Sequence, residues 1–437
     1  MSDAPVRSID LLVAGASGVA TCAPAGADLG RPARRGELSE LGFVSGGAVA
    51  IDRGRVVDVG PAGDLAARYA PRERLDARGG VVVPGFVDAH THPVFRFGRE
   101  DDFERRARGE TYAQIAAAGG GILSSVRGVR EASDEELELR VRARLDRFLD
   151  LGTTVVEAKS GYGLSVRDEL RSLRVIARAK GSHDVRVVPT LLAAHALPPE
   201  WRERRGEFLE AIEQELLPAV AAEKLAQFHD VFVDQGFFTI EEGRRLLRAG
   251  ERFGLRPKIH ADELGCTRAT ALAMELGCVS ADHLDHVAPE DVERLASSET
   301  VAVLLPGVSH FLRVPGDAPA RAMVAAGAAV ALATDYNPGT CPTQSMFEVM
   351  HLAVQRMGLT AAQALVAATR NAAFALGLGG ETGVIAPGRR ADLVVCDVPD
   401  PRDLVYSFGR PPVAFVVCGG MVVRRSDRRA DGVPALV

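Results

Sequence analysis

The chain has 437 residues, of which 47% are hydrophobic and 25% are charged, and its formal net charge is −6. This composition is globular, without a block of like charge or an apolar run near the roughly 18 residues of a membrane helix, so we expect no nucleic-acid partner and no membrane span. The six cysteines are scattered without a C-x-x-C pair and the N-terminus lacks a signal pattern, so we expect a reduced, cytoplasmic protein.

Both ends of the chain show the patterns of short β-strands. Near the start, segment 47–60 (GAVAIDRGRVVDVG) is apolar around an Arg-Gly turn. Near the end, segments 391–398 and 413–425 repeat this pattern, with two glycines at a hairpin position in the second. We therefore predict one small β-sandwich domain built from residues 1–70 and 378–437, around a central domain of residues 71–377.

The central region alternates strand-like and helix-like segments. Eight apolar stretches are typical of buried strands: residues 81–90, 153–161, 185–195, 229–236, 255–263, 278–286, 300–307 and 328–337. Among the helices between them, the clearest begins after Ser133, which has Glu136 at capping-box spacing, and this spacing recurs at 239–242 and 360–363. Eight such units predict an α/β fold, a (β/α)8 TIM-type barrel, with a doubly wound open sheet as the alternative.

The connection after the first strand, residues 93–132, is unusually long. It contains Gly119-Gly120-Gly121. Long connections in compact domains are commonly functional, so we expect this segment to be a mobile or closely packed loop over the site.

Polar side chains gather where the predicted barrel strands end, which is where such barrels carry their chemistry. His90 and His92 share one face of the first strand because they lie two residues apart. Further residues at these ends are Glu157, Lys159, Tyr162, His195, Asp234, His260, Glu263, His283 and Asp335. Five of the ten histidines in the chain are among them, which indicates a metal site.

We expect His90, His92, His260 and Asp335 to hold one metal ion. Three imidazoles and a carboxylate suit Zn²⁺, Fe²⁺ or Mn²⁺ with a position open for water. A metal ion lowers the pKa of such a water toward about 7, so a metal-bound hydroxide is the expected nucleophile.

Three side chains are candidates for the chemistry itself. Asp335 is expected to take a proton from the attacking water, Glu263 to carry protons to the leaving group, and His283 to hold the nucleophile or the developing oxyanion. His286 lies close to His283 in sequence, and we expect one of the two to be structural. Lys159 could be carboxylated and bridge two metals, or could form a structural ion pair, and the residues alone leave both open.

The order of these motifs resembles the amidohydrolase superfamily, which shares PGFVDAHTH and the TD after the eighth strand. Within it, the chain is similar to the imidazolonepropionase family of histidine degradation, on FGREDDFERR, ETYAQIAAAGGGILSSV, VEAKSGYGL, LLAAHALP, KIHADE, ADHLDH and ATDYNPGT. The H-x-H and TD motifs are specific to the superfamily, whereas SGYGL and TDYNPGT are specific to the family.

The resemblance implies hydrolysis of the ring C–N bond of 4-imidazolone-5-propanoate, a small-molecule substrate, to N-formimidoyl-L-glutamate. It implies a homodimer and one metal ion, zinc or iron, which argues against a carboxylated Lys159. The metal ligands carry over onto the same four residues as above. The substrate contacts that it implies are Arg99, Tyr162, His195, Glu263, Asn337, Gly339 and Thr340, with Tyr112 as a weaker candidate.

Arg99 also fits this substrate by its chemistry, since a guanidinium binds a carboxylate through paired hydrogen bonds. On the residues alone, a salt bridge with Glu100 or Asp101 is an equal interpretation. Cys341 departs from the small polar residue that the family pattern leads us to expect. The competing functions are a deaminase or another cyclic amidohydrolase of the superfamily, and a non-enzymatic barrel protein, which is disfavoured because all four metal-ligand positions are filled.

Overall fold

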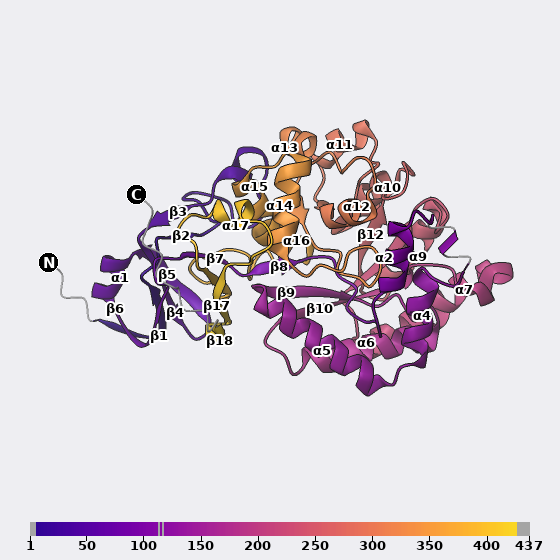
Figure 1. Cartoon of the computed structure of the whole chain (residues 1–437), viewed down its shortest axis with the longest axis horizontal. Coiled ribbons are helices and arrows are strands. Elements are labelled where there is room, and N and C mark those ends of the chain that lie inside the picture. The colour runs from indigo at the N-terminus through magenta and orange to yellow at the C-terminus, as the bar shows by residue number, and fades with distance from the viewer. Residues whose placement is uncertain (1–5, 112–113, 116–117, 426–437) are drawn as a thin grey trace.

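The computed structural model describes residues 6–111, 114–115 and 118–425, and its largest sheet has eight parallel strands in sequence order (Figure 1). These strands are β8 (Phe86–Asp88), β9 (Thr153–Lys159), β10 (Arg186–Ala194), β11 (Phe228–Val233), β12 (Arg256–Ala261), β13 (Ser280–His283), β14 (Val301–Leu304) and β15 (Val330–Leu332). Each predicted segment overlaps one of them, and nearly all their residues are buried. The predicted (β/α)8 barrel is therefore confirmed.

The barrel closes where its first strand meets its last. The N–H of Asp335 donates to the His90 carbonyl at 3.0 Å, and the N–H of His92 donates to the Tyr336 carbonyl at 2.8 Å. Thr91 and Tyr336 form an isolated parallel bridge between the same two segments. The closure of the barrel thus uses the segments that carry three of the predicted metal ligands.

Helices follow most barrel strands and cover the outside of the sheet (Figure 1). The α-helices are α1 (Ala62–Arg68), α2 (Glu100–Ala107), α4 (Ile122–Glu131), α5 (Asp134–Asp150), α6 (Val166–Lys180), α7 (Arg205–Ala211), α8 (Leu217–Glu223), α9 (Ile240–Arg252), α10 (Ala269–Leu276), α11 (Pro289–Leu295), α12 (Pro306–Leu312), α13 (Ala320–Ala326), α14 (Met346–Met357), α15 (Ala361–Val366), α16 (Ala372–Ala375) and α17 (Asp403–Tyr406). Short 3-10 segments are η1 (Arg35–Ser39) and η2 (Pro199–Arg204), and short π segments are η3 (Ile212–Leu216) and η4 (Ala367–Asn371).

The predicted helix starts coincide with side-chain caps. The Ser133 side chain accepts the N–H of Glu136 at the start of α5. Complete capping boxes open α9, at residues 239–242, and α15, at residues 360–363. Each cap satisfies N–H groups that the first helical turn leaves without partners, so the sequence positions these helices locally.

Two further sheets come from the two chain ends. One has the order β5 (Arg55–Pro61), β4 (Gly47–Asp52), β1 (Arg7–Ala14), β6 (Tyr69–Asp76); the other has the order β18 (Met421–Arg425), β17 (Val413–Cys418), β16 (Leu393–Cys396), β7 (Val81–Pro84), β2 (Gly18–Ala20), β3 (Phe43–Ser45). The predicted antiparallel pairs are present, including the β17–β18 hairpin across Gly419-Gly420. β1 with β6 and β2 with β7 pair in parallel, which no local pattern indicated.

The two terminal sheets pack on each other around a shared apolar core. Leu11 and Val49 of the first sheet belong to the same buried cluster as Val82 and Val417 of the second. The predicted β-sandwich built from both chain ends is therefore confirmed, and it forms the left-hand part of the molecule in Figure 1.

The predicted strand 81–90 is divided between two sheets. β7 pairs with β16 and β2 in the six-stranded sheet, whereas β8 pairs with β9 in the barrel. A Cβ on Gly85, between them, would overlap the side chain of Thr154. Only a residue without a Cβ fits at this point, so Gly85 is required where the chain passes from the terminal sheet into the barrel. The domain limits of 1–70, 71–377 and 378–437 stay a proposal.

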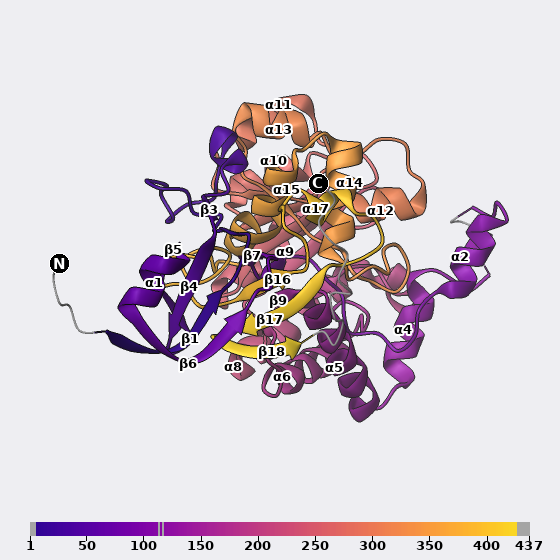
Figure 2. The same ribbon diagram turned by 60° about the vertical axis from the view of Figure 1, so that its left-hand side comes forward.

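The long connection after β8 is largely helical in its described residues, where it includes α2 and α4. Figure 2 shows α2 and α4 standing out on one side of the barrel. The two helices are tied together where the N–H of Gly121 donates to the Asp102 carboxylate at 2.8 Å. The described residues of the segment thus include helices that are linked to each other, and the expected mobile or closely packed state of the segment stays a prediction.

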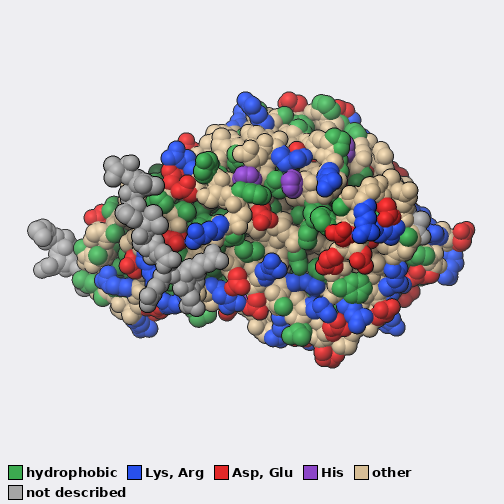
Figure 3. Space-filling view, in the orientation of Figure 1, with side chains coloured by type: hydrophobic (Ala, Val, Ile, Leu, Met, Phe, Trp, Pro, Cys, Tyr) green, Lys and Arg blue, Asp and Glu red, His purple; other side chains and the backbone are tan. Residues whose placement is uncertain are grey.

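The surface agrees with the composition. Acidic and basic side chains are intermingled over the face seen in Figure 3. Within the described ranges, no helix has the length and apolarity to cross a bilayer.

Candidate metal centre and substrate pocket

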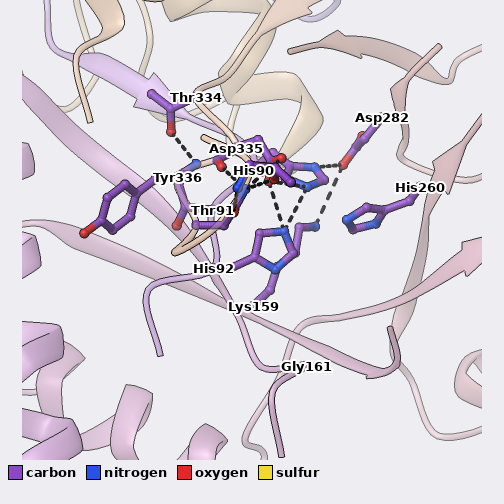
Figure 4. Close-up of polar contacts among 12 residues, drawn as sticks. His90, Thr91, His92, Lys159, Gly161, His260, Asp282, Thr334, Asp335 and Tyr336 are labelled. Carbon is purple, nitrogen blue, oxygen red and sulfur yellow. Dashed lines mark hydrogen bonds and ion pairs between the residues drawn. The ribbon is translucent and has the colours of Figure 1, made fainter. Parts of the chain in front are cut away.

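Four imidazoles and one carboxylate lie together at the carboxyl end of the barrel. His90 and His92 follow β8, His260 lies in β12, His283 ends β13 and Asp335 follows β15. His92 Nε2 lies 3.2 Å from His90 Nε2 and 3.1 Å from Asp335 Oδ1. Figure 4 shows His90, His92 and Asp335 converging, with His260 alongside. The parallel barrel therefore brings together residues up to 245 positions apart in the sequence.

The nitrogen and oxygen atoms of these side chains form two groups that share His90. One group is His90, His92 and Asp335, and the other is His90, His260 and His283; within each, the ligand atoms lie within 4.8 Å of one another. The ring centroids of His90 and His260 are 4.4 Å apart. The structure thus gathers the four predicted ligands, divided between the two groups, and places His283 beside them.

The state of these residues fits a metal cation. Asp335 Oδ1 is buried and has no hydrogen-bond donor among the described residues. Burial lowers the pKa of His90, His92 and His283 well below the usual value, so their imidazoles are neutral. Neutral imidazole and carboxylate are the forms in which these side chains bind a metal ion. Burial raises the pKa of Asp335 to about 7, a cost that a neighbouring cation offsets.

Two carboxylates inside the barrel orient the imidazoles. His90 Nδ1 lies 2.6 Å from Asp282 Oδ2, and His260 Nδ1 lies 3.0 Å from Asp230 Oδ2. A hydrogen bond at Nδ1 fixes the ring and leaves Nε2 for a metal. Neither carboxylate was predicted from the sequence, although a charged residue within a buried apolar strand is the signal that marks both.

Lys159 forms ion pairs inside the barrel. Its Nζ lies 2.7 Å from Asp230 Oδ2 and 2.9 Å from Glu157 Oε2, and Lys258 Nζ lies 2.8 Å from Glu157 Oε1. Burial acts against the charge on Lys159, but the surrounding carboxylates outweigh it and raise the pKa of this lysine. Carboxylation requires a neutral amine, so the geometry favours the ion-pair interpretation over a carboxylated lysine.

Glu263 stands opposite His283 at the edge of the metal centre. Glu263 Oε2 lies 3.5 Å from His283 Nε2. Burial and three nearby carboxylates raise the pKa of Glu263 well above its usual value, which favours a protonated acid. The backbone at Glu263 is held by Asp234, whose Oδ2 accepts the N–H groups of Glu263 and Leu264 at 2.7 and 2.9 Å. The sequence had assigned no role to Asp234.

The backbone is strained at two of these side chains. His283 has a φ of 82° and Asp335 a φ of 51°, in the left-handed region that residues with a Cβ seldom adopt. Strain of this kind persists where the surrounding structure enforces it, and it clusters at functional sites. The strand ends are thus shaped to direct these two side chains inward.

A cavity of about 510 Å³ opens over His92, His260 and Asp335, three of the predicted metal ligands. Apolar side chains form much of its wall, among them Phe103, Phe232, Phe237 and Phe311. The predicted substrate contacts that line it are Arg99, Tyr162, His195, Glu263, Asn337 and Thr340. Gly339 is not among the lining residues, and Tyr112 lies outside the described part of the chain.

Arg99 is held in the cavity wall without a close ion pair. Its side chain is 8% exposed, it lies 4.0 Å from Asp102, and its Nε has no hydrogen-bond partner among the described residues. Among the described residues, Arg99 forms no ion pair with Glu100 or Asp101, so the alternative interpretation of this arginine is wrong. A Cβ on Gly339 would overlap the Arg99 guanidinium, so Gly339 acts by leaving room for it.

The turn after β15 is organised by Asn337. Its Oδ1 accepts the N–H groups of Gly339 and Thr340 at 2.9 and 2.7 Å, and its Nδ2 donates to the Asp335 carbonyl at 2.7 Å. The Asn337 amide is thus engaged within the turn, where it holds Asp335 in place.

His195 and Tyr162 form the wall next to His92. The rings of His195 and His92 stack at 5.1 Å, and the Tyr162 ring lies 6.0 Å from that of His92. His195 Nδ1 donates to the Gly161 carbonyl at 2.9 Å. A carbonyl oxygen only accepts, so the proton of the neutral imidazole lies on Nδ1 and Nε2 is left as an acceptor.

The sequence of this chain is similar to those of known proteins over nearly its whole length. The model of the amidohydrolase family matches residues 81–424. The chain is 44% identical to the imidazolonepropionase of Geobacillus kaustophilus over 90% of this chain and 93% of that protein. It is 44% identical to that of Symbiobacterium thermophilum, over 96% and 98%, and 46% identical to that of Rubrobacter xylanophilus, over 89% and 94%.

Solved structures agree on the fold. An adenosine deaminase from Xanthomonas campestris with bound zinc superposes with a TM-score of 0.68 at 21% identity, covering 96% of this chain and 93% of that one. A 5-methylcytosine deaminase from Klebsiella pneumoniae gives 0.72 at 17% identity, covering 97% and 100%. The family match and the relatives of 44–46% identity show that the chain belongs to the imidazolonepropionase family of amidohydrolases.

Proposed function

We propose that this chain hydrolyses the ring of 4-imidazolone-5-propanoate to N-formimidoyl-L-glutamate, the reaction of histidine catabolism that its family carries out. In this reaction the oxygen of water bonds to the ring carbonyl carbon, the C–N bond breaks, and the nitrogen receives a proton. The observation that carries the proposal is the coincidence of the metal centre with an arginine-bearing cavity in a chain of this family.

The metal centre is proposed to comprise His90, His92, His260 and Asp335. When bound, a divalent ion such as zinc or iron supplies the Lewis acidity that makes a water acidic near neutral pH. The contacts of His90 Nδ1 with Asp282 and of His260 Nδ1 with Asp230 support this, since they hold these two imidazoles with Nε2 free for the metal.

Three side chains have proposed roles in proton transfer and charge stabilisation. Asp335 accepts a proton from the attacking water. Glu263, whose raised pKa favours the acid form, donates a proton to the leaving nitrogen. His283, 3.5 Å from Glu263, stabilises the negative charge that develops on the carbonyl oxygen.

Recognition of the propanoate group is proposed to depend on Arg99. Its Nε has no partner among the described residues, and a guanidinium suits a carboxylate. Tyr162, His195, Asn337 and Thr340 are the other proposed substrate contacts on the cavity wall.

Assembly and location are also proposals. We infer a homodimer, as the family resemblance implies, and size-exclusion chromatography with light scattering measures it. A reduced cytoplasmic setting is supported by the cysteines, all six of which lie in described residues and are unpaired.

The test is product identity. The metal-loaded protein is incubated with 4-imidazolone-5-propanoate in ¹⁸O-labelled water, and the products are analysed by mass spectrometry with an ammonia assay. We expect N-formimidoylglutamate with one ¹⁸O in its new carboxylate and no ammonia. Ammonia release would identify a deaminase instead, and no product from the metal-loaded protein would contradict the proposal.

A further inference from the structure

A buried carboxylate outside the proposed machinery gathers the backbone of one loop. Glu169 lies in the first turn of α6 and is fully buried. Its Oε2 accepts the N–H of Gly161 at 2.9 Å, and its Oε1 accepts those of Gly163 and Leu164 at 2.7 and 2.8 Å. Within the described residues no cation pairs with Glu169. Its charge is stabilised by hydrogen bonds from these N–H groups and from the Ser160 hydroxyl.

This loop, residues 160–164, carries one proposed substrate contact and supports another. Tyr162 lies within it and lines the cavity. The Gly161 carbonyl accepts the bond from His195 Nδ1, while the Gly161 N–H goes to Glu169. Gly161 therefore links Glu169 to the orientation of the His195 ring through its N–H and its carbonyl.

The loop cannot take this path without its glycines. Gly161 has a φ of 116°, and a Cβ there would lie 3.0 Å from His195 Nδ1. A Cβ on Gly163 would lie 2.5 Å from the Asp168 carbonyl carbon, at the start of α6. The close approach of the loop to the helix is what lets the Glu169 side chain reach three of its N–H groups.

The other side of the loop is fixed by a cation. Arg130 in α4 donates from Nε to the Gly163 carbonyl at 2.8 Å and from Nη2 to the Leu164 carbonyl at 3.1 Å. Glu169 therefore binds the loop N–H groups from the inside while Arg130 binds its carbonyl groups. Burial raises the pKa of Glu169, and the hydrogen bonds from the loop act in the opposite direction.

We propose that Glu169 is a positioning residue for substrate binding: its carboxylate holds loop 160–164 so that Tyr162 and His195 face the substrate. This inference rests on the proposed function, because it takes these two residues as substrate contacts. It assigns a task to a residue that touches neither the substrate nor the metal ligands. The SGYGL motif is then explained by its fit around one carboxylate.

The substitution that tests this is Glu169→Gln. Glutamine has the same size, and its oxygen can keep the bonds to Gly163 and Leu164, but its amide group meets the Gly161 N–H donor to donor. We expect KM for 4-imidazolone-5-propanoate to rise about tenfold with kcat changed less than about threefold and metal content unchanged. The matched control is Asp392→Asn, a buried carboxylate of the terminal domain that accepts the Gly419 N–H at 2.8 Å.

A double-mutant cycle shows whether Glu169 acts through His195. In a His195→Ala background, Glu169→Gln is expected to raise KM by less than about half as much as in the wild type, because one of the two residues that Glu169 positions is already gone. Equal effects in both backgrounds would overturn the inference. A KM of Glu169→Gln equal to that of an active wild type would also overturn the inference.

A readout independent of activity separates this inference from the proposed function. The ¹⁵N shifts of the His195 ring, recorded by NMR for the wild type and Glu169→Gln, are expected to differ, and those of Asp392→Asn to match the wild type. Unchanged His195 shifts in Glu169→Gln would overturn the inference. If the wild type is inactive but the His195 shifts of Glu169→Gln still differ from those of the wild type, only the proposed function is contradicted. If Glu169→Gln does not fold, Glu169→Asp, which keeps the charge on a shorter stem, must show the same shifts.

Discussion

Individual charges inside the barrel are stabilised by partners that are remote in sequence. Lys159 pairs with Asp230, 71 positions away, and Lys258 pairs with Glu157, 101 positions away. The sequence placed Lys159 at a strand end but left its state open, because of its two carboxylate partners only Glu157 lies in its own strand, and the position of Asp230 follows from the assembled sheet. The proximity of the proposed metal ligands was predictable since each lies at a strand end, whereas the carboxylates that bind their imidazoles become evident only when the strands are assembled.

The first residue-scale prediction concerns Lys159. Replacing it in Lys159→Met leaves Asp230 and Glu157 without one of their buried cations. We expect the free energy of unfolding to fall by about 3–5 kcal/mol, measured by urea denaturation.

Lys224→Met is the control for this substitution. Lys224 is exposed at the end of α8, so its removal should change stability by less than about 0.5 kcal/mol. A loss for Lys159→Met no larger than that of the control would show that Lys159 is not part of a charge-balanced network.

The second residue-scale prediction concerns Arg99→Ala. Removing a guanidinium that binds the propanoate carboxylate should raise KM about a hundredfold while metal content stays the same, measured by steady-state kinetics and metal analysis. The control is Arg108→Ala. Arg108 is exposed at the end of α2, the helix that begins after Arg99, so its removal should leave KM unchanged. An unaltered KM in Arg99→Ala would point to a substrate without this carboxylate.

At the scale of elements, strand ends were predictable and the boundaries between sheets were not. All eight barrel strands end at one rim because they are parallel, so their terminal polar residues could be assigned to one site. The division of the apolar run 81–88 into β7 and β8 left no mark except Gly85, since both halves are buried. The turn 335–340 has an ordinary Asn-Pro-Gly composition, and its contact with Arg99 depends on a segment more than 200 residues away.

The prediction at this scale is Gly339→Ala. The added methyl group would occupy the space of the Arg99 guanidinium, so the side chain must move. We expect KM to rise at least about tenfold with kcat less affected.

Gly63→Ala is the matched control, because a Cβ at this glycine of α1 meets nothing within 4 Å. Its kinetics should be those of the wild type. Wild-type KM in Gly339→Ala would show that Arg99 does not depend on this close approach.

At the scale of the whole molecule, the proposed metal centre lies where the barrel closes. His90 and His92 come from the segment after the first strand and Asp335 from that after the last, and the same segments exchange the closing hydrogen bonds. An ion bound there joins the two ends of the barrel. The overall α/β class and the sandwich of both termini followed from sequence patterns, whereas this closure could be seen only in three dimensions.

The prediction at this scale is that metal stabilises the fold. Adding Zn²⁺ or Fe²⁺ to chelator-stripped protein at roughly 100 times its Kd should stabilise the folded state by about 2.7 kcal/mol. Differential scanning calorimetry should show Tm rising by several degrees, and Asp335→Ala should lose most of this rise. An equal rise in that variant would place the ion elsewhere.

The most direct measurement is the turnover of freshly prepared 4-imidazolone-5-propanoate, followed by its ultraviolet absorbance, with the purified protein and a chelator-stripped sample side by side. We expect rapid loss of absorbance that disappears on stripping and returns with zinc or iron. No loss by protein that carries one metal ion per chain would contradict it, and the proposed contact of Arg99 with a propanoate carboxylate would then be the first assignment to fall.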